Sequence, residues 1–151
     1  MNTAFQGTHI KILFRADSEK LRDKSLLSAV LLHIVESIHM QALFEPTVCN
    51  IKERLEELGV DNKFIDTGGL TSFVPISTSH IAIHTWPLEC EAVLDVYSCK
   101  RFDRKIPMNI INEYYEPAFA KVSDLSQSLY QNESNRRIDI IYRFEKTEIE
   151  V

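Results

Sequence analysis

Hydrophobic and polar positions near the start of the chain predict one strand followed by one long helix. Residues Thr8–Arg15 alternate apolar and wetter positions, a period typical of a strand with one wetter face. Apolar residues then recur at helical spacing between Leu26 and Ile38, and Asp17 or Ser18 is a suitable cap. We therefore expect a helix that begins near Ser18 or Lys24 and ends near Ala42.

The middle of the chain reads as shorter elements. Phe44–Ile51 fits a short strand, and Lys52–Leu58 followed by Gly59 fits a short helix with a glycine cap. Leu70–Ser77 is a further strand, and Pro75 within it lacks the N–H of a ladder bond. This strand is therefore expected at an edge of the sheet, or bulged at the proline.

Two apolar runs of strand length follow, joined by a short turn. Ser79–Trp86 and Glu91–Cys99 are rich in Ile, Val, Tyr and Trp, and Pro87–Cys90 connects them. Several polar side chains of chemical capacity lie inside these runs, which a purely structural hairpin would rarely need. They are Ser79, His80, His84, Asp95 and Cys99.

The last third of the chain predicts a second helix and a final strand. Ile106–Lys121 has an apolar side at helical spacing, with Pro117 expected to kink or end the helix. Ser123–Arg136 is polar and reads as a loop, and Arg137–Phe144 alternates like a strand. Together these elements predict an α+β fold: an antiparallel-rich sheet of five or six strands with two main helices on one face.

Composition narrows the class of protein. The chain has 151 residues, enough for one domain with a real core, and residues 1–151 are expected to form a single domain. A net charge of −5 gives no reason to expect a nucleic-acid partner. Three cysteines without metal spacing, no signal peptide and no membrane-length apolar run favour a cytoplasmic protein without a metal site or a membrane partner.

The stretch around the two joined strands also resembles a known family. It reads Ser79-His80, then Ile83 to Pro87 (IHTWP), then Asp95 to Cys99 (DVYSC). This pattern is similar to the core of the bacterial and archaeal S-adenosylmethionine decarboxylases, pyruvoyl enzymes of polyamine synthesis. A weaker resemblance covers most of the chain and begins with a Gly-x-His motif at Gly7.

The resemblance implies that the chain cuts itself between Thr78 and Ser79. In the family the matching serine attacks the carbonyl before it and forms an ester, and elimination then cleaves the chain. The new N-terminal residue becomes a pyruvoyl group, a ketone that captures a substrate amine as a Schiff base and accepts electrons as carboxylate leaves. The implied cofactor is therefore a pyruvoyl group made from Ser79, and the implied substrate is S-adenosylmethionine.

Three further residues match family positions with a role in this chemistry. His84 matches the histidine that removes the Cα proton during processing, and Cys99 matches the donor that reprotonates the substrate carbon. Thr71 lies where the family usually has a serine that polarises the attacked carbonyl. His80 is expected to pack or hydrogen-bond rather than to catalyse.

The spacing of the hairpin places these residues unevenly. A turn centred near Leu88 and Glu89 gives paired residue numbers that sum to about 177, which sets Cys99 opposite Thr78. The same register leaves His84 five residues along the strand, roughly 17 Å from Ser79. Either the strand bends near Ser77–His80, or one group comes from a second copy of the chain.

The chain departs from the family at positions that matter for the substrate. Thr78 replaces the usual glutamate before the serine, and Leu88 replaces a glutamate that contacts the ribose hydroxyls. Glu89 or Glu91 could take over that contact, and Phe64 is the nearest candidate for stacking on adenine. Two alternatives to S-adenosylmethionine decarboxylation therefore stay open: a pyruvoyl decarboxylase for arginine or ornithine, and an uncleaved, non-catalytic paralogue that acts as a partner or regulatory subunit. A small α+β binding domain outside the family is a further possibility.

The expected architecture also predicts an assembly. Helices on a single face leave the other face of the sheet bare, and exposed apolar area is unfavourable in water. The resemblance implies that a second protomer covers this face. We therefore expect a homodimer built as a sheet-to-sheet sandwich, with both cleaved chains retained in each protomer.

Overall fold

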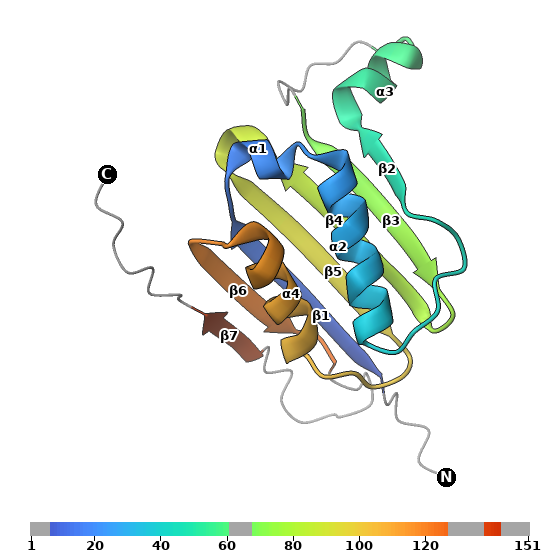
Figure 1. Ribbon diagram of the computed structural model, residues 1–151, viewed down its shortest axis with the longest axis vertical. Helices are drawn as coiled ribbons and strands as arrows, with labels where there is room; N and C mark the ends of the chain where they lie inside the picture. Colours follow the sequence, from blue (N-terminus) through green and yellow to red (C-terminus); the bar gives the residue numbers. More distant parts are fainter. Residues whose placement is uncertain (1–6, 61–67, 127–137, 143–151) are drawn as a thin grey trace.

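One antiparallel sheet dominates the computed structural model, which describes residues 7–60, 68–126 and, for the backbone alone, 138–142. Within these residues seven strands follow the spatial order β2-β3-β4-β5-β1-β6-β7 (Figure 1). The fold is α+β, as predicted, with one strand more than the five or six expected. The strands are β1 (Thr8–Arg15), β2 (Thr47–Asn50), β3 (Leu70–Ile76), β4 (Ser79–Trp86), β5 (Glu91–Ser98), β6 (Phe119–Asp124) and β7 (Ile138–Tyr142).

Two helices lie across one face of the sheet. Figure 1 shows α2 (Lys24–Ser37) and α4 (Lys105–Tyr115) on the same side of the strands. The Asp23 side chain accepts from the amide of Leu26 and caps α2, so one orphan N–H of the first turn is satisfied. The apolar stripe of each helix packs on the strands and supplies much of the buried core.

The predicted first helix was correct in its core and in its start at Lys24, and wrong at its C-terminal end. A separate short helix, α1 (Ser18–Leu21), is capped by Asp17. The non-helical residues Arg22 and Asp23 separate it from α2. Asp23 as the cap of a new helix competes with continuation of the old one. Helix α2 ends at Ser37 rather than Ala42, because Ala42 forms a bridge to Ile76 of the sheet.

The predicted helix Ile106–Lys121 was also too long. It ends at Tyr115, where Glu116 adopts a left-handed conformation with a φ of 45° and Pro117 follows. A proline cannot continue the helix, which agrees with the expectation that Pro117 could end it. Residues Phe119–Asp124 form β6 instead, so the polar loop expected from Ser123 was wrong for its first two residues. Leu125 and Ser126 follow the strand outside any helix or strand, as expected, and residues 127–136 lie outside the described residues.

The proline of strand β3, Pro75, lies beyond the part of the strand that pairs with β2, so it removes no hydrogen bond between these two strands. The register with β2 ends at the pair Thr47 and Phe73, and Pro75 lies beyond it. There the Pro75 carbonyl accepts from the amide of Leu43 instead. The predicted edge or bulge was therefore wrong: β3 lies between β2 and β4 with a continuous register to β4, and beyond β2 the chain at Ala42 and Leu43 pairs beside Pro75. The short helix α3 (Ile51–Glu57) follows β2 and ends before Gly59, whose φ is +68°, as expected.

The hairpin β4–β5 has the predicted register. Its turn is a short 3-10 helix, η1 (Pro87–Glu89), and Ser79 pairs with Ser98. Strand β4 runs without a break from Ser79 to Trp86. The predicted bend near Ser77–His80 is therefore limited to the turn before β4 and does not fold the strand back on itself.

The sheet has one buried face and one open face. Alternate side chains of β1, β4 and β5, such as Ile12, Ile83 and Leu94, are fully buried beneath the helices. Their neighbours face the other way and are partly exposed, with no element of the described chain above them. Phe73 and Trp86 on this open face are 45% and 38% exposed. No helix of the described residues is long and apolar enough to cross a membrane.

Candidate functional site

Ser79 follows directly after a two-residue turn. Ser77 and Thr78 connect β3 to β4, and Ile76 pairs with Ser79 across this hairpin. Such a tight turn places the peptide bond between Thr78 and Ser79 at the end of the sheet rather than inside it. Ser79 is half-buried and Ser77 is exposed. The predicted cleavage site is thus held by a hairpin whose flanking strands are both fixed.

The Thr78 carbonyl at this turn is hydrogen-bonded to the neighbouring strand. The backbone N–H of Cys99 donates to the Thr78 carbonyl oxygen at 2.9 Å, so Cys99 lies opposite Thr78 as the register predicted. Thr78 itself is only 8% exposed, whereas the Cys99 side chain is exposed. The hydroxyl of Ser98 donates to the Thr78 hydroxyl at 2.9 Å. An amide aimed at a carbonyl is the donor type that stabilises an oxyanion.

His84 and Thr71 lie together at the opposite end of β4. Thr71 pairs with His84 in the register, and Thr71 Oγ1 is 3.0 Å from His84 Nδ1. His84 is exposed on the open face of the sheet, beside the ring of Trp86. Five residues of extended strand separate His84 from Ser79, or about 17 Å. One chain therefore brings Ser79 and Cys99 together, and brings Thr71 and His84 together, but keeps these two pairs apart.

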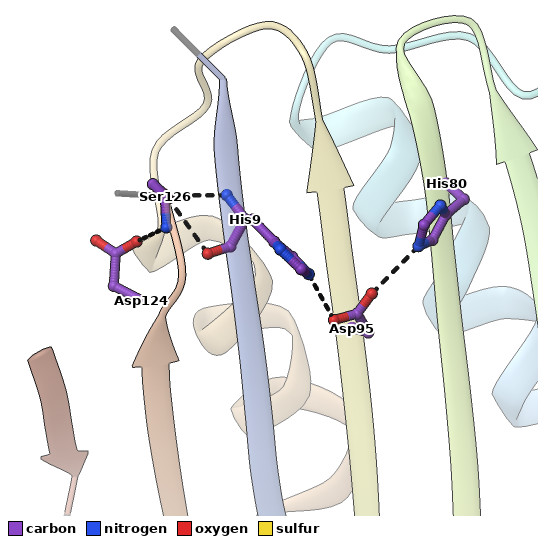
Figure 2. Close-up of polar contacts among 5 residues, drawn as sticks. All are labelled: His9, His80, Asp95, Asp124 and Ser126. Carbon is purple, nitrogen blue, oxygen red and sulfur yellow. Dashed lines mark hydrogen bonds and ion pairs between the residues drawn. The ribbon is translucent and has the colours of Figure 1, made fainter. Parts of the chain in front are cut away.

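A second polar cluster lies on the open face between those two ends. His9 Nε2 is 2.8 Å from one carboxylate oxygen of Asp95, and His80 Nε2 is 3.2 Å from the other (Figure 2). Burial alone raises the pKa of Asp95, but the hydrogen bonds and charges of His9 and His80 outweigh it. The pKa of Asp95 consequently lies below its ordinary value. The ring of Tyr97 lies between the histidines, with ring centroids 5.1 Å from His9 and 5.6 Å from His80.

Sequence reasoning found only part of this cluster. His80 was expected to hydrogen-bond, and it does, but His9 was noted only as part of a Gly-x-His motif. Nothing local in the sequence pairs His9 with Asp95, because the two strands are 86 residues apart along the chain. Figure 2 also shows Ser126 bound to the backbone of His9, a contact that no motif pointed to.

The residues expected to contact substrate lie near the turn η1. Glu89 is exposed, and Leu88 beside it is 54% exposed. Trp86, one residue before η1, is next to His84. These side chains are therefore at the His84 end of the hairpin and not at the Ser79 end. Phe64, the candidate for stacking on adenine, lies outside the described residues.

The described part of the chain holds no group of three or more His, Cys, Asp or Glu side chains that could bind a metal ion. The donors that do converge are a backbone amide, hydroxyls and a thiol at the turn, and an imidazole with a hydroxyl at the far end. These groups can polarise a carbonyl, supply a nucleophilic hydroxyl and move protons.

Comparison with known proteins identifies relatives of this chain. A family model described as S-adenosylmethionine decarboxylase matches residues 9–128. The S-adenosylmethionine decarboxylase proenzyme of Pyrobaculum aerophilum is 30% identical over 119 residues, 78% of this chain and 84% of that protein. Proenzymes from Pyrococcus furiosus and Pyrobaculum arsenaticum are 34% and 39% identical over 67 and 69 residues. Those two matches span about half the length of each relative, 48% and 55%.

The fold has a counterpart among solved structures. The crystal structure of the adenosylmethionine decarboxylase from Aquifex aeolicus superposes with a TM-score of 0.61. The match covers 85% of this chain and 96% of that chain, at 22% sequence identity. At this identity the likeness establishes the shared fold.

Proposed function

Because this chain belongs to the S-adenosylmethionine decarboxylase family, we propose that it is a self-processing, pyruvoyl-dependent decarboxylase acting on S-adenosylmethionine. The observation that carries the proposal is the Thr78 carbonyl held on the Cys99 N–H at a tight turn directly before Ser79. A peptide bond held in this way can accept attack by the serine that follows it. Decarboxylated S-adenosylmethionine, a building block of polyamines such as spermidine, would be the product.

Self-cleavage begins at the Thr78 carbonyl carbon. The Ser79 hydroxyl oxygen attacks it, and the negative charge that develops on the carbonyl oxygen is met by the Cys99 N–H. The bond from that carbon to the Ser79 nitrogen breaks, and the nitrogen takes up the hydroxyl proton. An ester now joins Thr78 to the Ser79 side chain, and Ser79 has a free amine.

Elimination then cuts the chain. A base removes the Cα proton of Ser79, the bond from Cβ to the ester oxygen breaks, and Thr78 leaves as a carboxylate. Water converts the remaining dehydroalanine, through its imine, to a ketone and ammonia. The resulting pyruvoyl group supplies an electron sink for decarboxylation. The exposed thiol of Cys99, opposite Thr78, is suited to return a proton to the substrate carbon.

His84 is the base in this scheme, and it must come from a second copy of the chain. Strand β4 is unbroken, so His84 of the same chain stays about 17 Å from Ser79. Across a two-fold axis on the open sheet face, the His84 end of one copy lies against the Ser79 end of the other. The imidazole of His84, oriented by the Thr71 hydroxyl at 3.0 Å, then faces the turn of its partner. Two such sites form per dimer.

The open sheet face supports this assembly. It carries apolar side chains that water disfavours, among them Leu13, Phe73, Val93 and Trp86. Each 100 Å² of apolar area removed from water contributes about 2.5 kcal/mol. Sedimentation at micromolar concentration should give a dimer, and Phe73→Lys on the open face should shift it toward monomer. A wild-type monomer under these conditions would contradict the shared site.

The side chain at position 88 supports a second candidate function. Leu88 occupies the place where the family's ribose-contacting glutamate is expected, and its apolar side chain accepts no hydrogen bond from a hydroxyl. A pyruvoyl decarboxylase for arginine or ornithine therefore remains the second candidate. A non-catalytic paralogue is the third, favoured by the β-branched Thr78 at the carbonyl under attack.

One experiment separates these functions. Purified protein is incubated and its intact mass is followed for fragments 1–78 and 79–151, the second carrying a pyruvoyl group. Carbon dioxide release is then measured from carboxyl-labelled S-adenosylmethionine, arginine, ornithine and lysine. Cleavage with release from S-adenosylmethionine is the expected result. Release from a plain amino acid alone selects the runner-up, and a permanently full-length chain selects the paralogue.

A further inference from the structure

The buried hydroxyl of Ser98 contacts Thr78, the residue before the proposed cleavage site. Ser98 is fully buried at the end of β5, next to Cys99 in the chain and opposite Ser79 in the register. We propose that Ser98 is a positioning residue for self-cleavage, holding both Thr78 and the Cys99 N–H so that the carbonyl stays aligned with its donor. The proposal rests on the proposed function and deepens it.

The hydrogen bonds around Ser98 run in one direction. The backbone N–H of Lys100 donates to the Ser98 hydroxyl at 3.0 Å. The Ser98 hydroxyl donates to the Thr78 hydroxyl at 2.9 Å, and the Thr78 hydroxyl donates to the sulfur of Met40 at 3.1 Å. The Ser98 hydroxyl also lies 4.0 Å from the sulfur of Met40, and the shorter bond to Thr78 takes its single proton, so the line from Lys100 to Met40 is complete.

The hydrogen bonds of Ser98 hold both partners of the bond at the Thr78 carbonyl: the Cys99 N–H that donates and Thr78 itself. A serine side chain that accepts from the N–H two residues later forms a local turn, which orients the peptide between them. That turn contains the Cys99 N–H, the group that meets the Thr78 carbonyl oxygen. On the other side, the bond to Ser98 fixes the side chain of Thr78, whose branched Cβ has few rotamers. Ser98 therefore acts on both partners of the polarised carbonyl.

The arrangement answers a difficulty raised by the sequence. A threonine before the cleaved bond crowds the carbonyl, and the resemblance leads one to expect a glutamate there. Thr71, the other candidate for polarising this carbonyl, is bound to His84 at the far end of the hairpin. Within one chain the Cys99 amide is thus the donor seen on the Thr78 carbonyl, and the hydroxyl pair of Thr78 and Ser98 holds it in place.

The test compares matched variants during cell-free synthesis, with cleavage followed by intact mass over time. Ser98→Ala should cleave about ten- to a hundredfold more slowly than the parent, because small misplacements of reacting groups have effects of this size. Ser98→Thr keeps the hydroxyl and should restore most of the rate. Ser72→Ala is the control, since Ser72 is equally buried and its hydroxyl has no partner among the described residues. Its cleavage rate should be unchanged.

Hydroxylamine identifies the step that is affected, because it cuts esters and leaves ordinary peptide bonds intact. If Ser98 positions the carbonyl for attack, Ser98→Ala should accumulate little hydroxylamine-sensitive ester. His84→Ala, which lacks the later base, should accumulate more of it than the parent. Accumulation of the ester in Ser98→Ala would overturn the proposal, because Ser79 would then attack the Thr78 carbonyl normally without the Ser98 hydroxyl.

A double-variant comparison tests whether Ser98 acts through Thr78. Thr78→Val removes the hydroxyl with little change of shape and should itself slow cleavage. Adding Ser98→Ala to Thr78→Val should slow the chain by a smaller factor than Ser98→Ala slows the parent. If the double variant is slowed by the product of the two single factors, Ser98 does not act through the Thr78 hydroxyl and the proposal is wrong. If Ser98→Ala does not fold, Thr78→Val alone decides: a parent-like rate overturns the proposal.

Failure of this proposal is distinguishable from failure of the proposed function. If the parent chain never cleaves, the proposed function fails before any variant is compared. If the parent cleaves and Ser98→Ala, folded by circular dichroism, cleaves at the same rate, the proposed function stands and the role of Ser98 falls.

Discussion

At its turn end, the β3–β4 hairpin buries Thr78, and the Thr78 carbonyl is hydrogen-bonded to the adjacent strand. At its other end, His84 is exposed on the open face and bound to the half-buried Thr71. The turn end has donors for an oxyanion, and the histidine next to Ser79, His80, is bound to Asp95 on the open face. The far end has a base oriented by a hydroxyl, but no bond to cleave. In the proposed mechanism, the two ends carry complementary parts of one reaction.

The difference teaches how a straight strand can serve a compact site. A β-strand extends about 3.3 Å per residue, so groups five residues apart cannot meet within it. In the proposed dimer, two hairpins lie antiparallel across a two-fold axis, and the five-residue spacing of Ser79 and His84 becomes useful. Each copy would then offer its turn end to the far end of the other across the open sheet face.

The most severe change removes the nucleophile at the turn end. Ser79→Ala leaves no hydroxyl to attack the Thr78 carbonyl, so the chain should remain at the full mass of residues 1–151 without decarboxylase activity. Ser77→Ala, in the same turn and exposed, should cleave normally. Intact mass spectrometry checks both. Fragments 1–78 and 79–151 from the Ser79→Ala chain would show that a different group cuts it.

Cys99→Ala separates the two roles of Cys99 at the turn end. The backbone N–H that binds the Thr78 carbonyl is unchanged by the substitution, so self-cleavage should continue. The thiol is lost, and decarboxylation should fall about a hundredfold or more, as for other lost proton donors. Cys90→Ala, another exposed cysteine, is the matched control. Loss of cleavage together with activity would mean that the thiol also acts in processing.

At the far end of the hairpin, Leu88→Glu tests the substrate contact. Restoring a charged acceptor for ribose hydroxyls should tighten binding of S-adenosylmethionine about ten- to a hundredfold, which corresponds to roughly 1.5–3 kcal/mol. Leu88→Gln, of similar size without the charge, should give a smaller gain. The KM of the cleaved enzyme measures both. If neither variant lowers the KM, Leu88 is not the cause of weak substrate binding, and the segment around Phe64 is the next candidate.

The smallest expected effect concerns the cluster between the two ends. The pKa of Asp95 in the folded chain lies below its unfolded value near 3.8, because His9 and His80 favour the carboxylate over the effect of burial. Its contribution to the free energy of unfolding is therefore fully present above that unfolded value and is lost as the pH falls through the folded pKa. Urea unfolding of Asp95→Asn should show a weaker loss of stability on acidification than the parent. Glu113→Gln, an exposed carboxylate on α4, should keep the parental slope.

Much of the fold could be read from local patterns. Alternation predicted β1 with the bounds it has, and the proline-containing turn gave the register that puts Cys99 opposite Thr78. Local patterns failed where tertiary contacts decide. Phe119 continued the apolar stripe of a helix, yet it begins β6, because Glu116 and Pro117 end α4 and the next residues pair with β1. Helix propensity is weak, and pairing with an available sheet edge overrides it here.

The candidate site divided in the same way. The motif marked Ser79, His84, Cys99 and Thr71, and the hairpin spacing separated His84 from Ser79. No motif could say that Thr71 pairs with His84. Two contacts with distant segments were also beyond reach. Asp95 binds His9 from β1, and the Thr78 hydroxyl reaches Met40 beyond α2.

Mixing two inactive chains tests the central claim most directly, namely that one site is built from the two hairpin ends of different copies. Ser79→Ala keeps His84 but has no nucleophile, and His84→Ala keeps Ser79 but lacks the base. Each is expected to remain largely uncleaved alone, since loss of a general base slows a reaction by about 10² to 10⁴. When the two are co-expressed with tags of different mass, the His84→Ala chain should cleave and the Ser79→Ala chain should stay whole. If co-expression leaves the His84→Ala chain as slow as it is alone, the two ends do not meet across the dimer and the account is wrong.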